Sequence, residues 1–199
     1  MVKVSIASVD DLQDIVKIHI AAFPDFFLTK LGTNFLYLYY KSVLNNQDGI
    51  LLVSMIDGRC IGLCAGTVMS AGFNTRLIKS NITQYCIESL KLLFTNPKSL
   101  LHLMRNLTKE NSSVGDDGHY AELLSIAVDP RAQRVGAGKA MLQEMEIVVK
   151  KKGGERLSLT TDYKDNDKAI NFYKTLGYES WYDFITYPNR RMYRLIKNL

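Results

Sequence analysis

The feature that most limits what this chain can fold into is a strand followed by a basic, glycine-containing loop and a helix. Residues 125–140 read SIAVDPRAQRVGAGKA, so the apolar strand stops at Asp129-Pro130 and a helix can start after the glycines. The first N–H groups of a helix have no intrahelical partner and lie at its positive end, where they bind anions. Gly136 and Gly138 let an anion approach the backbone closely. The sequence therefore predicts a phosphate-binding loop.

The spacing of the glycines excludes two familiar phosphate loops. A P-loop anchored on Gly138 would need glycine at Gln133 and a hydroxyl at Ala140. A dinucleotide-binding G-x-G-x-x-G motif that starts at Gly136 would need a small residue at Met141. Neither pattern fits, so the phosphate belongs to another class of ligand.

Two motifs in the right order resemble those of one family. Residues 133–138, QRVGAG, are similar to the pyrophosphate-binding loop Q/R-x-x-G-x-G/A of GNAT superfamily N-acetyltransferases. Residues 166–178, NDKAINFYKTLGY, resemble the family signature N-x-x-A-x-x-F-Y-x-x-x-G-F/Y. The close resemblance covers residues 119–185, and the N-terminal half matches only in the order of its elements. It implies that the loop binds the pyrophosphate of acetyl-coenzyme A.

The hydrophobic periodicity predicts an α/β chain with one domain over residues 1–199. The predicted strands are 2–7, 50–56, 59–69, 120–128, 156–161, 178–186 and 191–197. The predicted helices are 12–22, 33–44, 138–152 and 167–176. This order resembles the GNAT fold, which implies a mixed, mostly antiparallel central sheet flanked by helices. A helical insert at about 74–111, between the third and fourth strands, departs from the simplest family pattern, and we expect helices there at roughly 80–95 and 97–109.

Composition narrows the class of protein. Hydrophobic residues make up 47% and charged residues 23%, as in soluble globular proteins, and a net charge of +5 is too mild to indicate nucleic acid. Three cysteines form no metal spacing and no disulfide framework. The start lacks a signal peptide and no run reaches membrane-spanning length. We expect a cytoplasmic protein with no metal and no membrane span.

The resemblance implies cofactor contacts from three segments. The strand would contribute the main chain of Ile126, Ala127 and Val128, with the amide of Ile126 or its neighbour as the oxyanion donor. The loop and helix start would contribute Gln133, Arg134, Val135, Gly136, Ala137, Gly138, Lys139 and Ala140. The second motif would contribute Asn166, Ala169 and Tyr173. Asn166 has an alternative structural role as a helix N-cap.

Two side chains are expected to carry the chemistry. Tyr173 matches the tyrosine that protonates the departing sulfur in many GNAT enzymes, and Phe172 is expected to do the packing beside it. Glu122, in ELLSIAV, matches the glutamate base of GNAT histone acetyltransferases. Many members place the base elsewhere or use a water chain, and a strand glutamate can also have no proton duty. His19 and His119, like His102, suggest no catalytic constellation and are read as structural.

The function expected from the resemblance is acetyl transfer from acetyl-coenzyme A to a small-molecule amine. The acceptor cleft would lie among residues 23–31, the insert and residues 181–191. Aromatic residues there could line it: Phe23, Phe26, Phe27, Tyr182 and Tyr187. Two alternatives stay open, namely acetylation of a protein or peptide amine and a non-catalytic acyl-coenzyme A-binding module. A homodimer is a further expectation from the resemblance.

Overall fold

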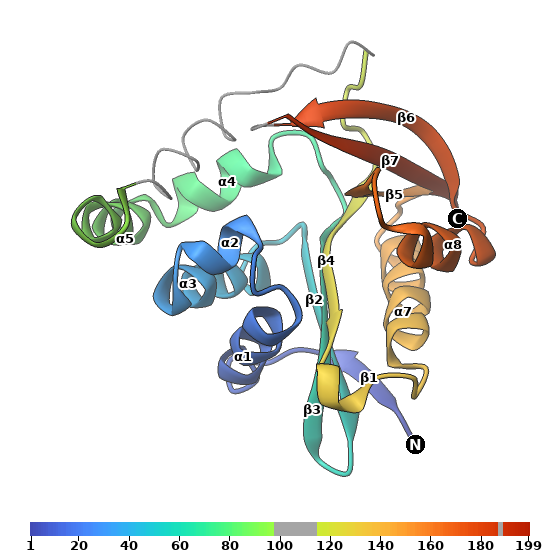
Figure 1. The fold of residues 1–199 in the computed structure, drawn as a ribbon, viewed down its shortest axis with the longest axis horizontal. Helices are drawn as coiled ribbons and strands as arrows, with labels where there is room; N and C mark the ends of the chain where they lie inside the picture. The colour runs from blue at the N-terminus through green and yellow to red at the C-terminus, as the bar shows by residue number, and fades with distance from the viewer. Residues whose placement is uncertain (98–114, 187–188) are drawn as a thin grey trace.

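A seven-stranded sheet in the order β1-β2-β3-β4-β5-β7-β6 organises the molecule (Figure 1). The computed structural model describes residues 1–97, 115–186 and 189–199. The strands are β1 (Lys3–Ile6), β2 (Gly49–Ile56), β3 (Arg59–Thr67), β4 (Ala121–Val128), β5 (Arg156–Asp162), β6 (Glu179–Thr186) and β7 (Arg190–Asn198). Among the described residues, β4 and β5 pair in parallel and the other ladders are antiparallel. The predicted mixed, mostly antiparallel sheet is confirmed.

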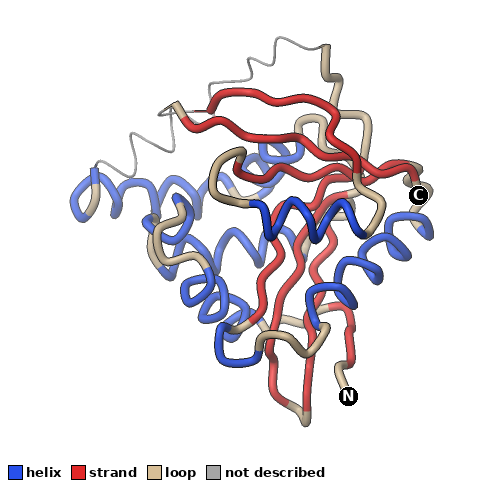
Figure 2. Tube along the Cα trace, turned by 45° about the vertical axis from the view of Figure 1, so that its right-hand side comes forward, coloured by secondary structure: helices blue, strands red, loops and turns tan. Residues whose placement is uncertain are grey.

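Helices cover both faces of this sheet, as Figures 1 and 2 show. One face carries α1 (Leu12–Ala22), α2 (Phe27–Lys30), α3 (Thr33–Leu44), α4 (Phe73–Ser80) and α5 (Ile82–Thr95). The other face carries α7 (Ala137–Lys151) and α8 (Asp167–Thr175). The predicted helices agree with these bounds to within a residue or two, because their apolar positions follow the helical period.

The insert between β3 and β4 differs in part from the expectation. The sequence predicts a first helix at about 80–95, whereas the structure has two helices that meet at Asn81. The first of them, α4, has only Phe73 and Leu77 as buried anchors. Such a short pattern among polar residues gives a weak periodic signal. Most of the second predicted helix, 97–109, lies outside the described residues.

Each face of the sheet has its own hydrophobic core. On the first face, Leu12 and Ile15 of α1 pack with Leu36 of α3, and all three are fully buried. On the second, Met141 and Met145 of α7 pack on the inner strands. The sheet therefore separates two cores, and strand β4 at its centre contributes side chains to both.

Candidate active site

Strand β4 is only partly joined to its neighbour β5. Among the described residues, their ladder ends at the pair Leu123–Leu159, whereas β4 stays paired with β3 as far as Val128. The β3–β4 register skips Leu124, which is a bulge in β4. Residues 124–128 therefore present main-chain groups toward β5 outside any β4–β5 ladder. An extended ligand can pair with such an edge as another strand would.

The predicted cofactor residues of β4 lie in this open stretch. Ile126 and Val128 are half-buried and pack against the core under α7 and α8. Ala127 is buried on the opposite face, in the core that includes α1. Their side chains are thus fixed by packing, which leaves the main chain as the part that can serve a ligand.

Asp129 anchors the start of the phosphate loop. Its carboxylate accepts hydrogen bonds from the Arg131 N–H at 2.9 Å, from Arg131 Nε at 3.0 Å and from Arg131 Nη2 at 2.8 Å, and it pairs with Arg59 at 3.3 Å. These hydrogen bonds and charges lower the pKa of Asp129 to about 2. The strand therefore ends in a turn that stays held at any physiological pH.

The loop that follows turns its backbone by means of left-handed residues. Arg134 has φ +68° and Gly136 has φ +81°, a conformation that costs a side chain about 1–2 kcal/mol. A Cβ at Gly136 would have no atom within 4 Å, so conformation rather than crowding requires glycine there. At Gly138 a Cβ would make only ordinary contacts, at 3.9 Å. Protein atoms therefore leave the space above both glycines open, and the close approach of an anion to this backbone stays a prediction.

Helix α7 begins without a side-chain cap, as an anion site requires. Gly136 is its N-cap, and the Ala140 N–H makes a helical hydrogen bond, to the Gly136 carbonyl at 3.0 Å. The amides of the first helical turn, at Ala137, Gly138 and Lys139, precede that bond and have no intrahelical acceptor. The side chains around them are exposed, namely Gln133, Arg134, Val135 and Lys139. The helix start therefore offers free backbone donors, and Arg134 and Lys139 add two exposed cationic side chains to the same segment.

Helix α8 carries the second predicted set. Asn166 is the N-cap residue of this helix, and its carbonyl accepts a hydrogen bond from the Ile170 N–H at 3.0 Å. Its side chain does not cap the helix: Nδ2 donates to Thr161 Oγ1 at 2.6 Å and to the Asp162 carbonyl at 3.2 Å, which ties α8 to the end of β5. Ala169 packs against the core beneath the helix.

Tyr173 lies deeper than expected. It is 9% exposed, while Phe172 is only half-buried, so the packing role expected of Phe172 falls more heavily on Tyr173. The rings of the two residues meet edge to face at 5.2 Å between centroids. Burial raises the pKa of Tyr173 above its ordinary value, and its phenol therefore stays protonated at neutral pH.

Glu122 lies where β4 is still paired with β5, opposite Ser158, just before the strands part. Both of its oxygens are engaged. Oε2 accepts a hydrogen bond from the Ser70 hydroxyl, and Oε1 accepts one from Arg194 Nη1 at 2.9 Å. Ser70 follows β3, and Arg194 is on β7, so three distant parts of the sequence meet at this carboxylate.

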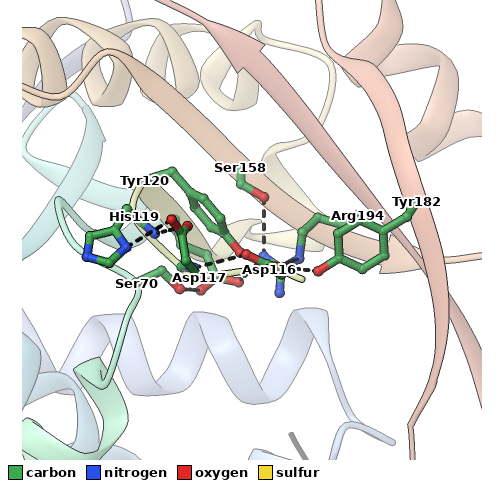
Figure 3. Close-up of polar contacts among 10 residues, drawn as sticks. Ser70, Asp116, Asp117, His119, Tyr120, Ser158, Tyr182 and Arg194 are labelled. Atoms are coloured by element: carbon green, nitrogen blue, oxygen red, sulfur yellow. Dashed lines mark hydrogen bonds and ion pairs between the residues drawn. The ribbon is translucent and has the colours of Figure 1, made fainter. Parts of the chain in front are cut away.

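Arg194 is the centre of the polar cluster in Figure 3. Besides Glu122, its Nη1 donates to Ser158 Oγ at 3.2 Å, and its Nε lies 3.5 Å from Asp116 Oδ2. Asp116 in turn accepts hydrogen bonds from Tyr120 at 2.7 Å and from Tyr182. Burial opposes ionisation of Asp116, but these phenols, the Gly118 N–H and Arg194 outweigh it and lower its pKa.

A second buried chain of polar side chains reaches β4 from helices α1 and α3. His19 of α1 is fully buried, and its Nδ1 lies 2.6 Å from the Tyr40 hydroxyl. That hydroxyl donates to Ser125 Oγ at 3.5 Å, beside the bulge. Burial lowers the pKa of His19 to about 4, so the imidazole is neutral at pH 7. The structural role predicted for His19 agrees with this position.

Several residues of this cluster were not predicted from the sequence. Ser70, Asp116 and Arg194 belong to no motif, and a register-based prediction of which strand faces which would have been needed to find them. His119 is exposed, and its Nδ1 lies 3.2 Å from Asp117 Oδ2. The predicted cleft residue Tyr187, like His102, lies outside the described residues.

The described aromatic residues expected to line the cleft lie in three places. Phe27 packs against a separate small core that includes Leu31 and Phe35. Phe23 and Phe26 contact the His19 ring, with centroids 5.1 and 6.2 Å away. Tyr182 belongs to the Arg194 cluster. The guanidinium of Arg190 lies 5.6 Å from the Phe26 ring centroid, so the segment after α1 reaches the start of β7. Residues 23–31 and the β6–β7 hairpin thus approach each other on the Glu122 face.

Two further features bear on the class of protein. Residues 1–97, 115–186 and 189–199 contain no group of three or more His, Cys, Asp or Glu side chains placed to hold a metal ion. Within the same part of the chain, none of the helices combines the length and the apolar character that a membrane crossing requires.

Comparison with known proteins agrees with this architecture. The model of the acetyltransferase (GNAT) family matches residues 12–178. An N-alpha-acetyltransferase of Sulfurisphaera tokodaii is 25% identical over 174 residues, which is 87% of this chain and 77% of that protein.

Solved structures show the same fold. The ribosomal-protein-S18-alanine N-acetyltransferase of Escherichia coli superposes with a TM-score of 0.63 at 17% identity, over 100% of this chain and 94% of that one. The PaiA N-acetyltransferase of Thermoplasma acidophilum, in complex with coenzyme A, gives 0.56 at 14% identity, over 100% and 99%.

Proposed function

Because the chain belongs to the acetyltransferase (GNAT) family, we propose that it transfers the acetyl group of acetyl-coenzyme A to a primary amine of a small molecule. The pyrophosphate binds at residues 133–140, and the pantetheine arm pairs with residues 126–128. The observation that carries this proposal is the open edge of β4, which leads directly into an uncapped helix N-terminus. These two features offer an extended ligand a row of main-chain partners that ends at a phosphate site.

The proposed reaction uses two side chains on either side of the open edge. A typical alkyl amine has a pKa of about 10 and must lose a proton before it attacks. Glu122 takes that proton, directly or through water, while the amine nitrogen bonds to the thioester carbonyl carbon. The carbon–sulfur bond then breaks, and Tyr173 gives its phenolic proton to the departing thiolate. The amide of Ile126 or its neighbour stabilises the oxyanion between these steps.

A compact acceptor is supported by the surroundings of Glu122. The carboxylates of Glu122 and Asp116 face a single guanidinium, that of Arg194, so the cluster has an excess of negative charge. Such a field favours an ammonium group. The contact between Arg190 and Phe26 narrows access on this face, which favours a small molecule over a folded protein surface.

The α-amine at the end of a peptide is a second candidate acceptor. A chain end is also narrow and cationic, so the same geometry can accept it. The similar proteins of Sulfurisphaera tokodaii and Escherichia coli bear the names of an N-alpha-acetyltransferase and a ribosomal-protein-alanine N-acetyltransferase. If the acceptor is a peptide, its second and later residues should also contact the enzyme. A small-molecule acceptor has no such residues.

Calorimetric titration tests the cofactor site first. We expect wild-type protein to bind acetyl-coenzyme A, and the Gly136→Asp, Gly138→Asp double variant to lose binding while circular dichroism shows an intact fold. Added negative charge at the helix N-terminus repels the phosphates. No binding by well-folded wild-type protein would contradict the proposal.

An acceptor screen then tests the amine. Release of free coenzyme A thiol is followed with polyamines, amino sugars, aromatic amines and amino acids, beside a set of peptides with different N-terminal residues. Turnover of a small amine with higher kcat/KM than any peptide supports the proposal. Preference for peptides, with kcat/KM rising as residues are added, favours the second candidate, and binding without any turnover favours an acyl-coenzyme A-binding module.

A further inference from the structure

Arg194 is a buried cation in a part of the sheet that could have been apolar. Its side chain is 14% exposed, and it lies on the same strand as fully buried Leu195, whose side chain faces the opposite core. Removing a guanidinium from water is costly, and replacing a buried ion pair by apolar residues is often neutral or stabilising. Stability alone therefore gives little reason for a charge here.

The guanidinium is held from several sides at once. Its Nη1 lies 2.9 Å from Glu122 Oε1, and its Nε lies 3.5 Å from Asp116 Oδ2. Three aromatic rings stand within 6 Å of its carbon, at 5.4 Å for Tyr120 and 5.9 Å for both Tyr182 and Phe184. A side chain with this many neighbours has little freedom, so it can fix the position of whatever it binds.

The two oxygens of Glu122 are held in different ways. Oε1 is bound by the charged, immobilised Arg194, through a charge-assisted hydrogen bond, which is the stronger kind. Oε2 is bound by Ser70, a neutral hydroxyl that can rotate to another partner. An arriving amine can replace Ser70 at Oε2, because that exchange leaves the ion pair intact.

We propose that Arg194 is a positioning residue for acetyl transfer, which clamps Oε1 of Glu122 so that Oε2 receives the proton of the acceptor amine. This inference rests on the proposed role of Glu122 as the base. Asp116 pairs with Arg194 and accepts hydrogen bonds from the phenols of Tyr120 and Tyr182, so it helps to orient the guanidinium. The clamp acts through Glu122 and does not touch the cofactor site.

The test compares Arg194→Met with Arg194→Lys, Glu122→Gln and the double variant Glu122→Gln, Arg194→Met. Arg191→Met is the matched control, because Arg191 is on the same strand and pairs with Asp183 at 2.7 Å on the exposed surface. Each variant is measured for kcat, for KM of the amine, for the dissociation constant of acetyl-coenzyme A, and for kcat/KM against pH.

We expect Arg194→Met to lower kcat by about tenfold to a hundredfold, and Glu122→Gln by about a hundredfold or more, with acetyl-coenzyme A affinity within about twofold of wild type. The profile of kcat/KM against pH should change in Arg194→Met and stay as in wild type in Arg191→Met, because Arg194 contacts the proposed base and Arg191 pairs with Asp183 instead. Arg194→Lys should recover part of the loss. The double variant should be no slower than Glu122→Gln alone, because Arg194 acts through that residue.

Each other outcome overturns a defined statement. Wild-type turnover by Glu122→Gln removes the base from the proposed function, and the clamp with it. If Glu122→Gln is impaired but Arg194→Met keeps wild-type kcat, the clamp alone is overturned. The clamp is also overturned if the loss of kcat in the double variant is the product of the losses in the two single variants. If Arg194→Met does not fold, Arg194→Ala is assayed with millimolar guanidinium added. Turnover that the guanidinium restores supports the clamp. Folded Arg194→Ala protein whose turnover is not restored contradicts it.

Discussion

The two sides of the open β4 edge are built in opposite ways. The proposed cofactor side consists of backbone: the main chain of residues 124–128 on the side that faces β5 outside the β4–β5 ladder, two left-handed loop residues and the uncapped start of α7. The acceptor side consists of side chains, with Glu122, Arg194 and Asp116 held in one network. Main-chain donors bind a feature that every acetyl-coenzyme A molecule shares, whereas side chains can be exchanged without changing the fold. The difference predicts that mutations on one side change cofactor affinity and on the other change turnover.

Tyr173 gives the largest test of this division, because it packs in the cofactor-side core yet is proposed to act in the chemistry. Tyr173→Phe keeps the ring and removes only the hydroxyl. We expect kcat to fall by about a hundredfold to a thousandfold, since a general acid contributes on that scale. The dissociation constant of acetyl-coenzyme A, measured by calorimetry, should stay within about twofold because the backbone site is untouched.

Tyr178→Phe is the matched control. Tyr178 is buried near Tyr173, with ring centroids 5.9 Å apart, but its hydroxyl donates to Glu146 at 3.1 Å. Its loss should lower the free energy of unfolding by about 1 kcal/mol and leave kcat nearly unchanged. Equal kcat losses in the two variants would show that packing, and not proton donation, explains Tyr173.

The second largest effect concerns His19, behind the acceptor side, and is an effect on stability. Burial lowers the pKa of this imidazole from the ordinary 6.5 to about 4, so between these values the unfolded chain binds more protons than the folded one. Stability is then complete above pH 6.5 and falls as the pH drops toward 4. The loss amounts to at most about 3 kcal/mol.

Urea unfolding of wild type and His19→Gln between pH 7.5 and 4 measures this loss of stability. The variant is expected to be less stable at neutral pH, since it disturbs the bond to Tyr40, but to lack the wild-type decline over this range. His119→Asn, which removes an exposed imidazole, is the control. Parallel curves for wild type and His19→Gln would mean that His19 titrates normally in the fold.

The local structure of the proposed cofactor side could be predicted from the sequence, for a physical reason. The loop and the start of α7 are contiguous, so strand end, glycines and helix start can be read from one stretch of residues 125–140. The fold followed similarly, because its strands and helices have clear apolar periods. The sequence analysis did not predict the positive φ of Gly136, because this angle is a property of the folded backbone.

On the proposed acceptor side, the sequence analysis named Glu122 and Tyr182 but not Arg194 or Asp116, for the converse reason. Arg194 meets Glu122 from 72 residues away, and Tyr182 meets Asp116 from 66 residues away. These contacts depend on the strand order β5-β7-β6, in which the last strand of the chain inserts beside β5. No local pattern carries that order, so an arginine in β7 looks like any surface cation. The same reasoning explains why Ser70, in a loop, was missed.

A smaller effect, about tenfold, is expected at Gly136. Gly136→Ala forces a side chain into φ +81°, which disturbs the loop that presents the helix amides. We expect acetyl-coenzyme A to bind about tenfold more weakly, from about 1–2 kcal/mol of strain, with kcat at saturation little changed. Gly153→Ala is the control, because Gly153 has φ +85° and equally open surroundings at the other end of α7. If both variants weaken binding alike, the effect is general destabilisation.

The smallest effect is expected at Asp129, which holds the loop through a single side chain. Its pKa of about 2 instead of 3.8 means that its interactions with Arg131 stabilise the fold fully above about pH 4 and are lost as the pH falls toward 2. Arg131 is exposed, so solvent screens the pair, and we expect Asp129→Asn to cost only about 1 kcal/mol at pH 7. The difference in unfolding free energy from wild type should vanish near pH 2.

Asp129 also tests whether a side chain can affect the backbone-built site. The carboxylate binds the Arg131 N–H and both its side-chain nitrogens, so it fixes the turn from which the loop departs. If the loop is held mainly by its own dihedral angles, Asp129→Asn should weaken acetyl-coenzyme A binding less than Gly136→Ala does. Asp183→Asn, at the exposed pair with Arg191, serves as control. A larger loss of affinity in Asp129→Asn would mean that the cofactor side depends on side chains as much as the acceptor side does.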